Sequence, residues 1–129
     1  MRIFKNAWFE RFCRKQRISD KALLEAIERA ERGQVDAHLG SGVIKQRLAR
    51  TGQGKSGGFR TVIFYRTAKR AFFMYGFAKS SRDNLEPDEE AQFKKAASHL
   101  LDVTDEQLAS LIANGQFLEV TANVKKVPE

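Results

Sequence analysis

Basic side chains without acidic neighbours fill the middle of this 129-residue chain. No aspartate or glutamate occurs between Ala37 and Arg82, whereas ten basic residues do: Lys45, Arg47, Arg50, Lys55, Arg60, Arg66, Lys69, Arg70, Lys79 and Arg82. The net charge of +7 is concentrated there, because residues 83–129 carry an acidic excess. Such a surface favours polyanions, and a nucleic-acid backbone is the first candidate. The alternative is that carboxylates of the C-terminal third neutralise it in the fold.

A glycine-rich segment, Thr51–Gly58, lies inside this basic stretch. Its Gly54-Lys55-Ser56 resembles the end of a phosphate-binding P-loop. However, the first glycine of that pattern would fall at Ala49, and a strand follows instead of a helix. A nucleotide hydrolase is therefore disfavoured. The bare backbone amides and Lys55 can still approach a phosphate closely.

Metal and thiol chemistry have little support in the sequence. His38 and His99 lie far apart and neither belongs to a recognisable ligand motif, so we expect no metal and no cofactor. We expect His99 to pack beside the apolar stripe of a helix. The single Cys13 excludes an intramolecular disulfide and falls on an apolar helix face. Any cleavage of a phosphodiester would therefore depend on lysine and arginine side chains.

The apolar spacing predicts the elements that position these cations. A short strand over Arg2–Phe4 is followed by a helix capped by Asn6 and ending near Arg17, with one apolar face: Trp8, Phe9, Phe12 and Cys13. Ser19 or Asp20 caps a second helix, which ends before Gly33 and has its own apolar stripe: Leu23, Leu24, Ile27 and Ala30. Together they predict a helix hairpin lying on one face of a sheet. We expect a loop over Gln34–Gly42.

Three strands are predicted in the basic stretch: Val43–Arg50, Phe59–Arg66 and Ala71–Lys79, the last two joined by the turn Thr67–Arg70. Side chains alternate along a strand, so Lys45 and Arg47 face away from Ile44 and Leu48. By the same alternation, the last strand carries four residues on one face: Phe73, Tyr75, Phe77 and Lys79.

The acidic C-terminal third predicts two more helices. Pro87 and the acidic residues after it suit a helix start, and the inner stripe follows as Phe93, Ala97, Leu100 and Leu101. Thr104 and Gln107 form a capping box for a short helix that ends at Gly115, and Phe117–Val120 is an edge strand. The predicted fold class is α+β: a small twisted, mostly antiparallel sheet with an N-terminal helix hairpin on one face and C-terminal helices. We expect one domain over residues 1–129, with 102–129 as a C-terminal helical extension.

Three motifs in this order resemble the RelE/HigB-like toxins of type II toxin–antitoxin modules, in the RelE/ParE superfamily. They are Val43-Ile44-Lys45, the segment Gly54-Lys55-Ser56-Gly57-Gly58-Phe59-Arg60, and the strand Phe73–Lys79 with Ser80 after it. The resemblance covers about residues 2–101. It implies a metal-independent ribonuclease that cuts messenger RNA in the ribosomal A site, and a cognate antitoxin as partner.

The resemblance also implies roles for particular residues. Arg60 matches the arginine that contacts the phosphate, and a planar, permanently charged guanidinium suits that task. Lys45 and Lys55 match the region that supplies a lysine near the ribose 2′-OH, and Lys79 matches a basic position that acts as acid or phosphate clamp. Further RNA contacts are expected from Arg47, Arg50, Arg82 and Tyr75.

One departure from the family pattern leaves alternatives open. Several members place a tyrosine or histidine just past the last strand, whereas Ser80, Ser81 and Arg82 follow here. Tyr75 or Tyr65 can substitute only if its ring faces the basic surface. The alternatives are a non-catalytic RNA- or ribosome-binding protein, a ParE-like toxin of DNA gyrase, or a basic groove that serves only to hold an acidic antitoxin segment.

The composition also bears on the compartment. One cysteine, charges within the first twelve residues, and no apolar run near 20 residues predict a soluble cytoplasmic protein without a membrane span.

Overall fold

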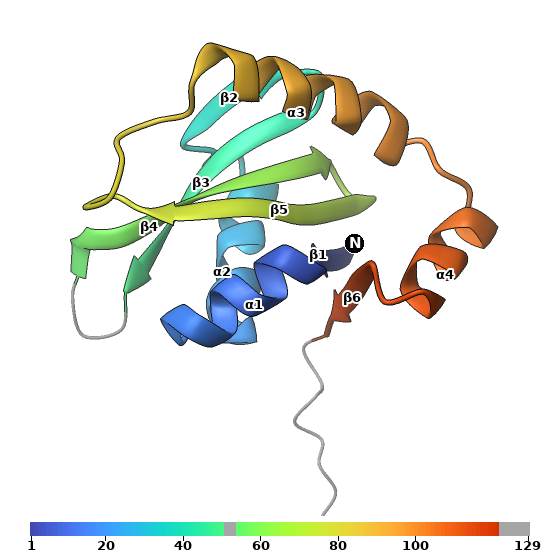
Figure 1. The fold of residues 1–129 in the computed structure, drawn as a ribbon, viewed down its shortest axis with the longest axis horizontal. Coiled ribbons are helices and arrows are strands. Elements are labelled where there is room, and N and C mark those ends of the chain that lie inside the picture. Colours follow the sequence, from blue (N-terminus) through green and yellow to red (C-terminus); the bar gives the residue numbers. More distant parts are fainter. Residues whose placement is uncertain (51–53, 122–129) are drawn as a thin grey trace, which may run out of the picture.

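A twisted sheet runs through the middle of the molecule, with helices on both faces (Figure 1). The computed structural model describes residues 1–50 and 54–121, including their side chains except those of residues 50 and 54–57. The strands are β1 (Arg2–Asn6), β2 (Ala37–Gly40), β3 (Val43–Arg50), β4 (Gly54–Arg66), β5 (Arg70–Ala78) and β6 (Phe117–Val120). They lie in the order β2-β3-β4-β5-β1-β6, and only β1 and β5 pair in parallel. The predicted α+β fold class is confirmed.

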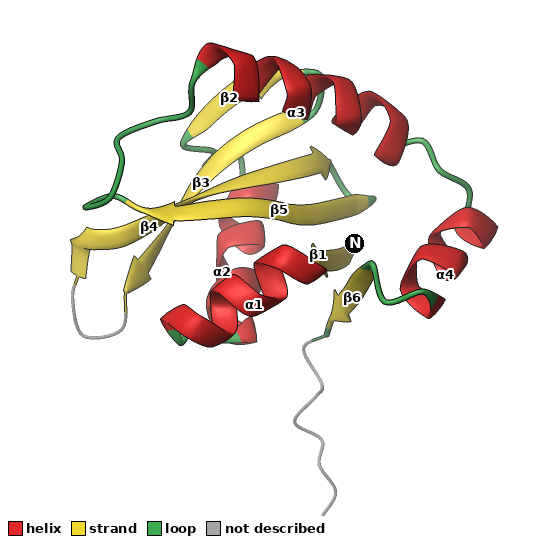
Figure 2. Ribbon diagram, in the orientation of Figure 1, coloured by secondary structure: helices red, strands yellow, loops and turns green. Residues whose placement is uncertain are grey.

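The N-terminal helix hairpin covers one face of the sheet, as predicted (Figure 2). In α1 (Ala7–Gln16) the Asn6 side chain accepts a hydrogen bond from the backbone of Phe9, and in α2 (Asp20–Glu31) Ser19 caps in the same way. The buried side chains of this face include Phe9, Cys13, Leu23, Ile27, Ile44, Leu48, Ile63 and Phe73. A Cβ on Gly76 of β5 would lie 2.8 Å from the Phe12 ring, so the glycine lets α1 approach the sheet closely.

The opposite face carries a second core beneath α3 (Pro87–Leu100) and α4 (Asp105–Ala113). Both helices begin with a capping box, at Glu86 and at Thr104. The buried side chains include Phe4, Val43, Val62, Phe64, Phe72, Ala97, Leu108 and Phe117. The predicted edge strand is β6, paired with β1. His99 is exposed, so its expected packing role is wrong.

Two predicted boundaries were wrong. The loop expected over Gln34–Gly42 contains β2, a four-residue edge strand that turns back into β3 through residues with positive φ: Gly40, Ser41 and Gly42. So short an edge strand gives almost no hydrophobic pattern. In addition, β4 begins at Gly54 instead of Phe59, because the glycine backbone pairs with β3 although glycine carries no strand preference. The rest of the expected loop, residues 51–53, lies outside the described chain.

A β-bulge in β5 overturns the expected alternation of its side chains. Tyr75 pairs with Val62 and Phe73 pairs with Ile63, which leaves Met74 as an extra residue between them. Phe73 therefore packs under the helix hairpin, while Tyr75 faces the α3 side together with Phe77, whose ring contacts it. The bulge divides a set of residues that simple alternation had put together.

Candidate functional site

The sheet face that carries α3 is only partly covered by this helix. Phe93 of α3 packs edge-on against Phe64, and Leu101 lies beside Gly42, so the helix occupies the end of β3 and β4 nearest the β2–β3 turn. Farther along the strands from this turn, Arg47, Arg60 and Phe77 lie opposite one another on β3, β4 and β5. Figure 1 shows this end of the sheet extending beyond α3. Arg47 and Arg60 can therefore meet solvent there, whereas Phe77 is buried.

Three of the predicted site residues line one hollow on this uncovered surface. Lys45, Arg47 and Arg60 surround a space of about 230 Å³, together with Asp36. Lys45 and Arg47 share a face on β3, as expected, and strand alternation puts Arg60 on the same face. No hydrogen bond or ion pair joins the Arg60 side chain to another described residue. Its guanidinium is thus available to an anion.

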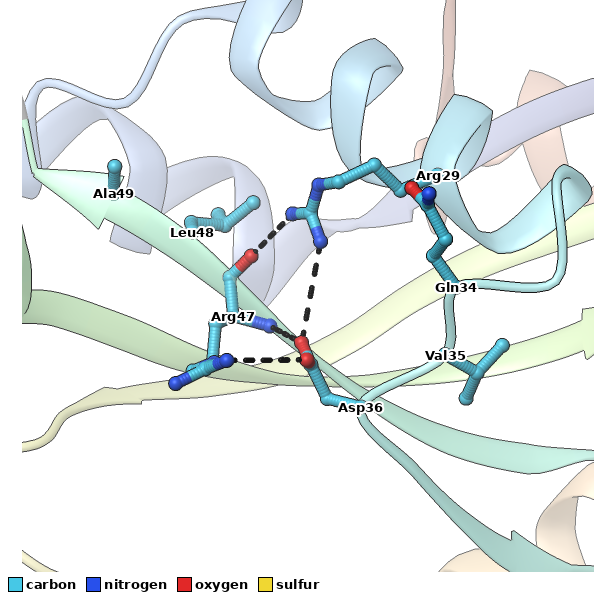
Figure 3. Close-up of a pocket in the computed structure, with 7 residues that line it drawn as sticks. All are labelled: Arg29, Gln34, Val35, Asp36, Arg47, Leu48 and Ala49. Atoms are coloured by element: carbon cyan, nitrogen blue, oxygen red, sulfur yellow. Dashed lines mark hydrogen bonds and ion pairs between the residues drawn. The ribbon is translucent and has the colours of Figure 1, made fainter.

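Arg47 is held in place by Asp36, which precedes β2. The Asp36 carboxylate accepts a hydrogen bond of 2.7 Å from the Arg47 backbone and lies 3.5 Å from its guanidinium. Arg29 of α2 approaches the same carboxylate at 4.0 Å and donates to the Arg47 carbonyl oxygen. These residues border a neighbouring hollow of about 410 Å³, in which Asp36 lies between the two arginines (Figure 3). Asp36 had no role in the sequence-based prediction.

Arg82 lies above the aromatic part of the same face. Its guanidinium makes two hydrogen bonds to Glu89, of 2.5 and 3.2 Å, and donates to the Tyr75 hydroxyl at 3.1 Å. It also stands 5.2 Å from the centre of the Phe77 ring. The hydrogen bond from Arg82 lowers the pKa of Glu89, and the bond to Glu89 raises the pKa of Arg82. Arg82 is therefore already paired with a carboxylate.

Asn84 links Arg82 to the cationic hollow. Its side-chain oxygen accepts a hydrogen bond of 2.6 Å from Lys45, and its carbonyl oxygen accepts one of 3.1 Å from Arg82. The segment after β5 thus connects β3 with the start of α3. Neither Asn84 nor Glu89 was predicted as a site residue. Glu89 was read only as one of the acidic residues that suit the first turn of a helix.

The remaining predicted site residues do not line this hollow in the described structure. Lys79 directly follows β5 and is exposed. Its backbone N–H donates to the carbonyl oxygen of Gly58 at 3.3 Å, and Gly58 precedes Arg60 by two residues. The side chains of Lys55 and Arg50 lie outside the described part of the structure. Tyr65 bonds to Glu31 on the α2 side, so of the two candidate tyrosines only Tyr75 faces the basic surface.

Carboxylates of the C-terminal third neutralise basic side chains mainly beside the β4–β5 turn. Arg66 pairs with Asp102 and Arg70 with Asp105, both at 2.8 Å, beside the β4–β5 turn. Only the pair between Arg82 and Glu89 brings such a carboxylate to the uncovered face among the described residues. The acidic C-terminal third thus leaves Arg60 and its neighbours largely cationic.

Other chemistries find no support in the described residues. There, no group of three or more histidine, cysteine, aspartate or glutamate side chains is placed to hold a metal ion. Burial raises the pKa of the Cys13 thiol to about 12, which disfavours a nucleophilic thiolate. Within the described chain no helix has the length and apolar character to cross a membrane.

Comparison with known proteins agrees with this architecture. A family model described as the RelE toxin of the RelE/RelB toxin–antitoxin system matches residues 1–120. The match continues through α4 and β6, beyond the residues 2–101 on which the sequence resemblance depended. No individual curated protein matches the chain. Toxins of this family have an antitoxin as partner. The chain belongs to the RelE toxin family of toxin–antitoxin systems.

Proposed function

We propose that this toxin is an endoribonuclease that cleaves messenger RNA on the ribosome and so inhibits translation. The observation that supports this best is the position of Arg60. Its guanidinium, which pairs with no described residue, shares one hollow with Lys45 and Arg47, on a sheet face that α3 leaves partly uncovered. A sugar-phosphate linkage entering this hollow would meet several cations at once.

The proposed reaction is an attack of a ribose 2′-OH on the neighbouring phosphate. A bond forms between O2′ and phosphorus, the bond from phosphorus to O5′ breaks, and the products are a 2′,3′-cyclic phosphate and a 5′-OH. One group must remove the 2′-OH proton, a cation must stabilise the pentavalent phosphorane, and another group must protonate O5′. Side chains alone can perform these three tasks, so we propose no resident metal or cofactor.

The proposed roles combine the family resemblance with the positions of those site side chains that the structure describes. Arg60 binds the phosphorane oxygens, because its permanent charge and planar donors are unused by described residues. Lys45, oriented by Asn84, and Lys55 are assigned to the side of the 2′-OH. Lys79, which follows β5, is assigned to the leaving oxygen. Arg47, Arg50, Arg82 and Tyr75 are proposed to contact the RNA around this centre.

The test compares wild type with Arg60→Ala and with Arg66→Ala, a matched arginine on the same strand that pairs with Asp102. Primer extension on a reporter message after induced expression reads cleavage, and co-sedimentation reads ribosome binding. We expect Arg60→Ala to lower cleavage by about 10²-fold or more while ribosome binding is kept, and Arg66→Ala to cleave normally.

Other outcomes point to other functions. Full cleavage by Arg60→Ala would remove Arg60 from the mechanism. A wild-type toxin that binds ribosomes but leaves the message intact would be a non-catalytic binder. Intact message together with DNA damage would indicate a gyrase-directed toxin on the same scaffold.

A further inference from the structure

We infer that Glu89, in the first turn of α3, is a positioning residue of the RNA-cleaving site, acting through Arg82 on Tyr75. The inference depends on the proposed function, because it assigns Glu89 to the same catalytic face. Glu89 itself contacts no residue of the cationic hollow in the described structure. Its influence would pass through the guanidinium that it holds.

The contacts of Arg82 leave it little freedom. Its Nη2 and Nη1 atoms donate to the two oxygens of Glu89, Nη1 also donates to the Tyr75 hydroxyl, and Nε donates to the carbonyl oxygen of Asn84. The planar guanidinium is thus engaged at all three nitrogens and packs near the Phe77 ring. Such a bidentate pair fixes orientation more firmly than a single contact. The Arg82 side chain is locked in one geometry.

This pairing also changes what Arg82 can offer to RNA. The adjacent carboxylate offsets its charge, so it attracts phosphate less than a free arginine would. Besides this weakened contact with RNA, Arg82 occupies a lone pair of the Tyr75 oxygen. No described residue accepts the hydroxyl proton of Tyr75, so this proton stays available to a bound substrate. Arg82 therefore presents Tyr75 as a hydrogen-bond or proton donor.

Tyr75 lies where such a donor can reach the proposed site. The bulge at Met74 turns its ring to the α3 side, and Val62 of β4 separates it from Lys45 of β3. Arg60 is two residues from Val62 along β4, on the same face. The ring is held between aromatic neighbours, with Trp8 at 4.8 Å and Phe93 at 5.9 Å. A fixed ring and a fixed hydroxyl partner would give the donor a defined direction.

Glu89 has a second contact that couples the site to α3. The oxygen that bonds Nη2 of Arg82 also accepts the backbone N–H of Glu86 at 2.8 Å, which closes the capping box of this helix. One carboxylate therefore fixes both the start of α3 and the orientation of Arg82. An ordinary capping residue would not need the second contact.

The test uses Glu89→Gln, which keeps an oxygen for the capping box but removes the charge and one acceptor. Cleavage is measured on ribosomes programmed with message, and binding on ribosomes whose message carries a 2′-O-methyl group at the cut site. We expect binding to become several-fold tighter, because the charge of Arg82 is no longer offset by a carboxylate, and single-turnover cleavage to fall about tenfold or more. Opposite changes in binding and cleavage would not arise from a loss of folding.

Glu90→Gln is the matched control, because Glu90 lies in the same turn but pairs with Lys94 at 3.4 Å. It should leave both quantities unchanged. A second comparison uses Tyr75→Phe, which should lower cleavage without tightening binding, and Glu89→Gln should add little to its loss of cleavage.

Each remaining outcome decides against the inference. If binding and cleavage rise together in Glu89→Gln, the carboxylate acts only as a local negative charge. If both fall, or neither changes, its role is only structural. These results count only if wild type cleaves; a wild type that does not cleave overturns the proposed function, and this inference with it.

Discussion

Lys5 is the only buried charged side chain among the described residues, with 8% of its surface exposed. Its ammonium group lies 2.6 Å from Glu10 and 2.9 Å from Asp20, so it ties β1 to the first turns of α1 and α2. Burial by itself would lower the pKa of Lys5, but the hydrogen bonds to Glu10 and Asp20 outweigh it and raise the pKa. The hydrogen bonds from Lys5 and Arg14 lower the pKa of Glu10.

Glu10→Gln should therefore destabilise the protein in a pH-dependent way. At pH 7 we expect a loss of about 1–3 kcal/mol in the free energy of unfolding, because a buried ammonium group loses a charged partner. The pKa of Glu10 is lower in the folded than in the unfolded state. Its stabilisation is therefore present above the ordinary value of 4.5 and disappears as the pH falls through the folded pKa.

Urea unfolding at a series of pH values, from pH 7 down to values below 4.5 at which the protein still folds, checks this prediction. The difference between wild type and Glu10→Gln should shrink as the pH falls below 4.5. Glu25→Gln, on the exposed side of α2, serves as control and should change the free energy of unfolding by less than about 0.5 kcal/mol. A difference that stays constant with pH would mean that the charge of Glu10 is not responsible.

At the scale of the elements, strong local signals predicted the helices and weak ones misplaced the strands. Asn6 and Thr104 were predicted as caps, and the second helix was expected to be capped by Ser19 or Asp20. The side chains of Asn6, Ser19 and Thr104 accept the capping hydrogen bonds. By contrast, the β5 bulge results from pairing with β4, and nothing in the order of apolar residues marks Met74 as the extra one. Pairing between strands is a tertiary property, so the face of Tyr75 could not be predicted from alternation.

Gly58 shows how closely β3 and β4 approach each other beside the site. A Cβ at this position would lie 2.2 Å from the carbonyl oxygen of Leu48, a backbone atom that can move only if the strand moves. Gly58→Ala should therefore cost about 1–3 kcal/mol in the free energy of unfolding and also lower RNA cleavage, because Arg60 follows two residues later on the displaced strand. Thermal unfolding and the cleavage assay measure the two effects.

Gly33→Ala separates the local effect from general destabilisation. Gly33 has a φ of 84° with no atom near the added Cβ, so alanine there should cost about 1–2 kcal/mol through backbone strain alone. Its cleavage activity should match wild type at temperatures where the protein is folded. If Gly58→Ala also keeps full activity, the spacing of β3 and β4 does not position Arg60.

At the scale of the whole molecule, the tertiary fold determines which of the basic residues pair with carboxylates. The concentration of cations between residues 37 and 82 correctly indicated a basic surface, and Lys45, Arg47 and Arg60 do line one hollow. The carboxylates that pair with arginines of this surface could not be predicted, because Asp36 and Glu89 lie outside the basic stretch. Their pairs with Arg47 and Arg82 form only when β2 and α3 pack against the rest of the sheet. Long-range pairing decides which cations remain free.

This pairing predicts that RNA binding depends more on the position of a cation than on the number of cations. Replacing Arg47 and Lys79 together by alanine should weaken binding to a 2′-O-methylated single-stranded RNA. It should also reduce the slope of log K against log salt concentration by about 0.7 for each phosphate that the protein no longer neutralises. The slope is measured by fluorescence anisotropy over a range of salt concentrations.

The matched control replaces Arg66 and Lys69, which lie at and just after the far end of β4, beside the turn into β5. This variant loses the same net charge, so a toxin that attracts RNA only through its overall charge would respond equally to both replacements. If the uncovered face is the contact surface, the control should keep nearly the whole wild-type slope, because its two cations lie at the β4–β5 turn, at least six residues beyond Arg60 along the chain. Equal slopes for the two variants would therefore contradict RNA binding at this face.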